Sequence, residues 1–181
     1  MTPDQIGLQD NSGMTALHYA SNKGPQVIEY LCQHMTNDQI GLQDEIGYTA
    51  LHSAIKNNSH DKEGIGFLCH YMTEDQVGLV DEFGQTALHY ACYSRTADEQ
   101  VVQVLCQSMK KNHVALENKA GQTALFYVCD DVFLIPYAGK KIKILTDHFT
   151  TEQLRTELKQ LEKRNHSPEH MAEIKKYLPE L

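Results

Sequence analysis

The sequence predicts an all-α repeat solenoid, a stack of helix-turn-helix units closed at its C-terminal end by further helices. The first observation is a recurring string, which reads GMTALHYA at 13–20, GYTALHSA at 47–54, GQTALHYA at 84–91 and, in altered form, GQTALFYV at 121–128. The second is its regular spacing, since the threonines of the four strings are Thr15, Thr49, Thr86 and Thr123. A regular period of this length is the signature of a repeat architecture. The third observation is an apolar stripe of helical period in each unit.

Each unit opens with a turn that leads into a first helix. Asp44 and Gly47 stand at the first and fourth places of a type I turn, where these residue types are preferred. Thr49 then predicts a helix start, because its hydroxyl can cap the free N–H groups of the first turn. Small residues at Ala50 and Ala54 give that helix a face suited to close packing.

A second helix follows a polar loop and carries the apolar stripe. In the second unit the stripe is Ile65, Leu68, Cys69 and Met72, spaced i, i+3, i+4 and i+7. One unit cannot bury such a stripe alone, whereas stacked neighbours can. The other units carry it at Ile28, Leu31, Cys32 and Met35; at Val102, Leu105, Cys106 and Met109; and at Ile142, Leu145, Thr146 and Phe149.

A short helical turn is predicted between the second helix and the next unit. Thr36 and Gln39 have the spacing of a capping box, in which each side chain bonds the backbone N–H of the other residue. Gly41 ends this turn. The same pattern recurs at Thr2/Gln5, Thr73/Gln76 and Thr150/Gln153.

Residues 151–181 predict a C-terminal helical cap. Leu154, Leu158 and Leu161 lie on one side of a predicted helix, and Ser167-Pro168 reads as the start of another, with Met171, Ile174 and Leu178 on its apolar side. Terminal units of solenoids need a polar outer face, because it meets water.

The pattern Asp-x-x-Gly-x-Thr-Ala-Leu-His-x-Ala, present at 10–20, 44–54 and 81–91, resembles that of the ankyrin-repeat family. The resemblance implies an array at 1–150, with units at about 10–43, 44–80, 81–117 and 118–150, followed by the cap at 151–181. The sequence departs from the family pattern in having Ala after the Thr. The fourth unit departs further, with Asn118, Phe126 and Val128 in place of Asp, His and Ala.

Composition sets limits on the class of protein. The chain has 181 residues, 41% of them hydrophobic, and a mean hydropathy of −0.47, so we expect a soluble globular protein without a membrane span or signal peptide. Five cysteines without metal-type spacing indicate reduced thiols and a cytoplasmic location. The net charge of −8 argues against nucleic acid and favours a protein partner with a basic or mixed apolar/basic surface.

The recurring histidines are interpreted as scaffold rather than chemistry. His18, His52 and His89 occupy equivalent helices, and packed helices lie about 8–10 Å apart. A zinc–nitrogen bond is about 2.1 Å long, so successive histidines cannot share one metal ion. Each histidine can instead bond the preceding threonine or a loop backbone group. We therefore expect neither a metal site nor a cofactor.

No group of residues predicts catalysis. The cysteines read as small core residues, with a regulatory thiol left open at Cys92 and Cys129. Asp130-Asp131 and the basic run that starts at Lys140 read as solvated surface, with an anion or lipid contact left open for the basic run. We therefore expect a protein that is not an enzyme.

The resemblance places partner binding on a concave surface formed by turn tips and first helices. Apolar and aromatic residues at turn tips suggest an interface, because tips are normally polar. The open alternative is that these side chains pack on neighbouring tips. The predicted contact residues are Met14, Glu45, Ile46, Tyr48, Glu82, Phe83, Gln85, Tyr93, Lys119 and Gln122.

The function predicted from these observations is a non-catalytic protein–protein interaction module, monomeric by itself. The alternative is a structural spacer or docking segment of a larger multidomain protein. One setting for that alternative is the ankyrin part of a secreted bacterial effector, which would act in the host cytoplasm.

Overall fold

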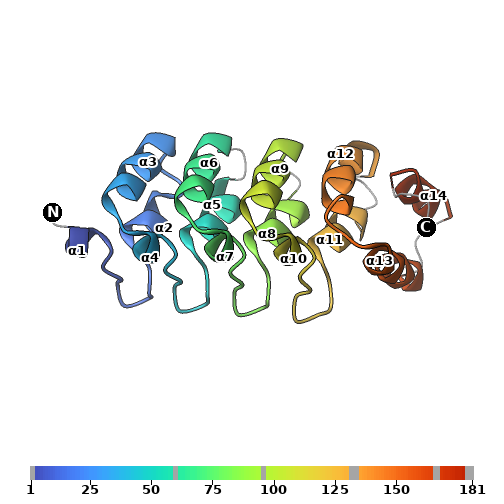
Figure 1. Cartoon of the computed structure of the whole chain (residues 1–181), viewed down its shortest axis with the longest axis horizontal. Coiled ribbons are helices and arrows are strands. Elements are labelled where there is room, and N and C mark those ends of the chain that lie inside the picture. The colour runs from blue at the N-terminus through green and yellow to red at the C-terminus, as the bar shows by residue number, and fades with distance from the viewer. Residues whose placement is uncertain (1–2, 59–60, 95–96, 131–134, 165–167, 178–181) are drawn as a thin grey trace.

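The structure, a computed structural model, describes residues 3–58, 61–94, 97–130, 135–164 and 168–177. Within these ranges the regular elements are all α-helices, and no strand is present. The helices form a row of stacked units, with the first and last helices at opposite ends of the row (Figure 1). The predicted all-α repeat solenoid is confirmed.

Each unit contributes two main helices, and a short helix follows them in the first three units and also precedes the first unit. The first helices are α2 (Ala16–Ala20), α5 (Ala50–Asn58), α8 (Ala87–Tyr93) and α11 (Ala124–Asp130). The second helices are α3 (Pro25–His34), α6 (Lys62–Tyr71), α9 (Glu99–Ser108) and α12 (Ile135–Thr146). The short helices are α1 (Pro3–Ile6), α4 (Asn37–Ile40), α7 (Glu74–Val77) and α10 (Lys111–Val114). The turns lie side by side along the lower edge of Figure 1. The first to fourth units are the predicted ranges 10–43, 44–80, 81–117 and 118–150.

Stacking buries the apolar residues that the repeat pattern singled out. Each first helix contacts the next first helix, and each second helix contacts the next second helix. The leucine of the recurring string is at most 1% exposed in every unit, and each stripe begins with a residue that is at most 1% exposed. Burying a side chain of this size stabilises the fold by about 1.5–3 kcal/mol. The residues concerned are Leu17, Leu51, Leu88 and Leu125, with Ile28, Ile65, Val102 and Ile142.

The short helices are capped as predicted and pack closely on the preceding unit. Thr36 and Gln39 form a capping box, as do the equivalent pairs at Thr73/Gln76 and Thr150/Gln153, while Thr2 lies outside the described residues. Gly41 lies against the side chain of Gln76, whose amide donates to Asn37 O at 2.8 Å. A Cβ at Gly41 would lie only 2.3 Å from Gln76 Nε2, so any larger residue there would have to displace the Gln76 side chain.

Two further helices lie against the fourth unit. Helix α13 (Thr151–Lys163) contacts α11, and α14 (Pro168–Lys175) contacts α12. Leu154 and Leu161 are buried and Leu158 is half-buried, which matches the apolar side predicted for α13. The predicted N-cap Ser167 lies outside the described residues, as does Leu178, which was predicted on the apolar side of the last helix.

Candidate protein-binding surface

The turns are shaped by one side chain at their first position. Asp44 Oδ1 accepts hydrogen bonds from the backbone N–H groups of Ile46 at 3.1 Å and Tyr48 at 2.7 Å. Gly47 supplies the positive φ of 83° that the turn needs. The same pattern holds at Asp10, Asp81 and Asn118, so the fourth unit keeps the turn although Asn replaces Asp.

Backbone hydrogen bonds join neighbouring turns. Glu45 N–H donates to Ser12 O at 3.1 Å, Glu82 N–H to Ile46 O at 2.9 Å, and Lys119 N–H to Phe83 O at 3.0 Å. The side chains of Gln9 and Gln43 add bonds to Gln43 O and Val80 O, so tip-to-tip packing exists and is made by the backbone together with these glutamines. The side chains of Ile46 and Phe83 at the tips remain exposed.

The recurring histidines connect successive units. Thr49 N–H donates to His52 Nδ1 at 3.2 Å, so Nδ1 is the unprotonated nitrogen and Nε2 carries the hydrogen. That Nε2 donates to Gln85 O in the next unit at 3.2 Å. His18 and His89 make the equivalent bonds to Tyr48 O and Gln122 O. We predicted that each histidine bonds its threonine or a loop backbone group, and each histidine makes both bonds.

Burial keeps these histidines neutral. His52 is 1% exposed, and desolvation lowers its pKa to about 4. The pKa values of His18 and His89 are lowered by the same cause. A neutral imidazole is needed here, because a protonated Nδ1 could not accept from the threonine N–H.

Most predicted contact residues are reachable from solvent. Phe83 is 53% exposed, Tyr93 69% and Ile46 40%. Glu45, Glu82 and Lys119 are also exposed, whereas Met14, Gln85 and Gln122 are half-buried.

Tyr48 differs, and the expectation that it is exposed is wrong. Its side chain is 7% exposed and stacks on His52 with ring centroids 5.6 Å apart. Its hydroxyl bonds the Tyr90 hydroxyl at 2.9 Å and accepts from Lys56 Nζ at 3.0 Å. The ammonium of Lys56 lies 4.8 Å from the Tyr48 ring centroid, within cation–π range. Tyr48 therefore supports the first-helix residues beneath the surface and is not available as a contact residue.

A set of tyrosines on the first helices was missed in the sequence. Tyr90 donates to Asp81 Oδ2 at 2.6 Å, and Tyr19 makes the same bond to Asp10. Desolvation and the bond to Asp81 raise the pKa of Tyr90. Tyr127 contacts Tyr93 edge-on at 5.7 Å. The signal was present, because these tyrosines follow the recurring histidine or, in the fourth unit, Phe126.

Together, exposed turn and first-helix residues form a surface that we call the inner face. It consists of Tyr19, Glu45, Ile46, Glu82, Phe83 and Tyr93. It combines four apolar or aromatic side chains with two carboxylates.

The residues that the sequence offered for other chemistry are buried in the core or form ion pairs. Cys92 and Cys129 are each 1% exposed, and burial raises both thiol pKa values, so neither is a reactive thiol. Asp130 pairs with Arg164 at 2.9 Å, while Asp131 lies outside the described residues. Lys140 pairs with Glu99 at 2.8 Å. Within the described ranges, no three His, Cys, Asp or Glu side chains are grouped to hold a metal ion.

Comparison with known families supports the repeat assignment. The family model for ankyrin repeats (3 copies) matches residues 2–76 and 61–135. This chain belongs to the ankyrin-repeat family. Ankyrin repeats generally mediate protein–protein interaction and are typically non-catalytic. A search of curated proteins found no match. Among the described helices of this ankyrin-repeat protein, none has the length and apolar character to cross a membrane.

Proposed function

We propose that this chain binds a partner protein through its inner face and performs no reaction. The observation that carries the proposal is the exposure of Phe83 and Tyr93, two large aromatic side chains of the third unit. Aromatic residues are enriched among the few residues that dominate binding energy at interfaces. Because the backbone already joins the tips, tip-to-tip packing does not account for the outward position of Phe83.

The partner that fits best has a basic or mixed apolar/basic surface. Glu45 and Glu82 are exposed and precede Ile46 and Phe83 on adjacent tips, so each of these two apolar side chains has a carboxylate next to it in the sequence. Complementary charge speeds association and fixes orientation more than it adds affinity. Lys119 on the fourth tip is the one predicted contact residue of opposite sign.

The setting that we propose is a reducing compartment such as the cytoplasm, with the chain monomeric before it binds. All five cysteines are buried and unpaired, which a reducing environment maintains. The chain then meets its partner as a folded, preformed surface.

The test compares capture of partner proteins by the wild type and by the Phe83→Ala/Tyr93→Ala double variant. Both substitutions remove exposed rings, so the thermal midpoint should change little. Losing two aromatic anchors should weaken binding by about 2 kcal/mol or more, roughly thirtyfold. Tyr30→Ala is the matched control, because Tyr30 is 58% exposed on α3, outside the inner face.

Capture by the wild type and by Tyr30→Ala, with loss in the double variant, supports the inner face and identifies the partner. Equal capture by all three proteins moves the binding site off the inner face. Specific capture by none of them favours the spacer alternative.

A further inference from the structure

The junction between the fourth unit and α13 departs from the repeat pattern. In the first three units a histidine ties each unit to the next, but Phe126 stands at that position in the fourth. The threonine before it bonds differently. Thr123 Oγ1 donates to Glu157 Oε1 on α13 at 2.6 Å. A carboxyl group from α13 thus takes over the connecting role of the histidine.

The bond to Thr123 uses only one of the two oxygens of the Glu157 carboxyl group. Glu157 is 5% exposed, and its second oxygen, Oε2, is buried without a hydrogen-bond partner. An ionised carboxylate buried in this way is costly unless a cation or a donor pairs with it. Burial, with a further contribution from the charge of Glu117, raises the pKa of Glu157 to about 7. Near neutral pH the group therefore exists both as an acid and as an unpaired anion.

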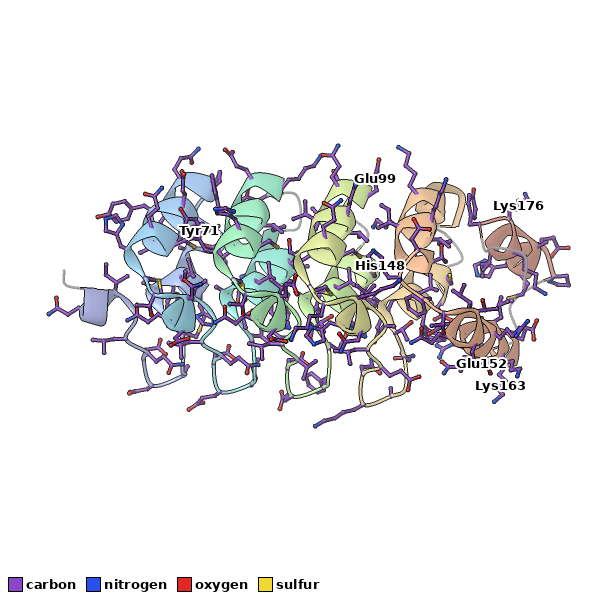
Figure 2. The ribbon with its side chains drawn as sticks, viewed as in Figure 1. Tyr71, Glu99, His148, Glu152, Lys163 and Lys176 are labelled. Carbon is purple, nitrogen blue, oxygen red and sulfur yellow. The ribbon has the colours of Figure 1, made fainter. Side chains whose placement is uncertain are left out.

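A pocket lies beside this carboxyl group. It has a volume of about 130 Å³ and is lined by residues from the end of the third unit, from the fourth unit and from α13, which lies at the end of the row (Figure 2). The pocket lies where the repeat pattern changes. Earlier units have glycine where Ala115 stands, and the following short helix lays a side chain directly on that glycine. The Ala115 methyl group occupies that place, and Ala115 and Gln153 line the pocket instead.

The pocket is acidic. Glu117, Glu152 and Glu157 all line it, and among the described residues the cation recorded near them is Arg155, 3.8 Å from Glu152 at the exposed rim. On the α11 side, the group near Glu157 is the Cys129 thiol, whose pKa is raised, and Asp130, which also acts on that thiol, pairs with Arg164. Nothing in this set neutralises Glu157 or Glu117.

We propose that this pocket binds an organic cation, an ammonium or guanidinium group that donates hydrogen bonds to the free oxygen of Glu157. Glu117 and Glu152 supply further negative charge at the rim. Oε2 is covered in the empty pocket, so binding shifts the carboxyl group toward the ligand. A proton competes for the same oxygen, so the cation binds more tightly as the pH rises through 7. The pocket contains no residue of the inner face, so this proposal does not depend on the proposed function.

The test is an NMR titration of the whole chain with ethylguanidinium and with butylammonium, following the carboxyl carbon of Glu157. Saturable shifts and an apparent pKa that falls below 7 are expected for both probes. Tetramethylammonium, which has the charge but no N–H donor, should bind at least tenfold more weakly. Glu157→Gln keeps the acceptor for Thr123 and should weaken binding of both probes by about tenfold or more.

Two further variants keep the result interpretable. Glu117→Gln alters the rim at an exposed residue and should weaken binding severalfold even if Glu157→Gln unfolds. Glu162→Gln removes the same charge from α13 outside the pocket and should leave binding unchanged. Equal binding of tetramethylammonium, equal losses in Glu162→Gln and Glu157→Gln, or no saturable shift would overturn the proposal.

The source of the cation is settled by a parallel titration with the peptide Gly-Gly-Arg-Gly-Gly. Binding at least as tight as that of ethylguanidinium assigns the pocket to an arginine side chain of a protein. Weaker binding by the peptide, with the free probe still saturating, assigns it to a free small cation.

Discussion

In each of the first three units, one histidine side chain makes a hydrogen bond at the helix start and another to the next unit. Nδ1 of His52 accepts from Thr49 at the helix start, and Nε2 donates to Gln85 in the next unit. The motif that looks like a catalytic pair is therefore a connector that fixes one tautomer. Its use of both nitrogens explains why burial of a titratable ring is tolerated here.

We predict that His52→Ala lowers the free energy of unfolding by about 2–4 kcal/mol. The change removes two buried hydrogen bonds, leaves Thr49 N–H without its partner, and leaves Gln85 O with only the bond from Asp81 N–H. Urea unfolding followed by circular dichroism measures the change. His70→Ala, an exposed site on α6, is the control and should shift the midpoint little. A similar shift in both variants would rule out the connector role.

The free energy of unfolding should also depend on pH, because His52 and Glu157 contribute to it in opposite directions as the pH changes. His52 titrates at about 4 when folded and near 6.5 when unfolded, so its contribution is present above pH 6.5 and is lost as the pH falls toward 4. The loss is roughly 3 kcal/mol for this residue. Glu157 has a raised pKa of about 7, so its contribution is present below pH 4.5 and is lost as the pH rises through 7.

Glu157→Gln should therefore make the free energy of unfolding fall more steeply between pH 6.5 and 4.5 than it does in the wild type. Denaturant unfolding at several pH values measures both slopes. Identical slopes for the two proteins would show that Glu157 titrates normally.

Residue types with one local role could be predicted from the sequence, and residues with distant partners could not. The turn aspartates and the capping threonines act on backbone within four residues, so their spacing reveals them. Tyr48 was misplaced because its environment comes from Tyr90, 42 positions away in the sequence. No local pattern records that contact.

At the scale of elements, the turns and short helices depend on how closely the units approach. Gly47 combines a φ of 83° with an absent Cβ that would lie 2.9 Å from Asp81 Cα in the next unit. Gly66, on α6, has a Cβ direction that meets nothing within 4 Å. Replacing Gly47 therefore tests backbone strain and close packing, whereas replacing Gly66 tests helix propensity alone.

We predict opposite effects for alanine at these two positions. Gly47→Ala should lower the free energy of unfolding by about 2 kcal/mol or more, because it imposes a left-handed conformation and a backbone clash. Gly66→Ala should raise it by about 0.5–1 kcal/mol through helix propensity. Thermal and urea unfolding measure both. Destabilisation of equal size in the two variants would contradict the close approach at the turn.

The same scale shows where element-level prediction stops. Periodicity reveals the helices, because burial on one face leaves a mark every three to four residues. The pocket at α13 is lined in part by Ala115, which stands where earlier units have glycine, and a single glycine-to-alanine difference between units carries no periodic signal.

For the whole molecule, contacts run mainly between neighbouring units, so stability should be transmitted along the row and fade with distance. The two C-terminal helices then protect the fourth unit in particular. Leu161 on α13 is 1% exposed and Ile174 on α14 is 0% exposed, and both belong to the continuous core. Replacing them tests whether the row behaves as one cooperative block or as linked units.

We predict that Leu161→Ala/Ile174→Ala raises amide hydrogen exchange in α11, α12 and α13 while leaving α3 and α6 nearly unchanged. Each substitution should cost about 2–5 kcal/mol locally, because it leaves a cavity in the C-terminal end of the core. Since the fourth unit packs on α13 and α14, its helices open first. Ile28→Ala, which is 0% exposed in the first unit, is the mirror control and should raise exchange in α3 before α12. Exchange that rises uniformly from α3 to α13 in either variant would show that the array unfolds as a single cooperative block.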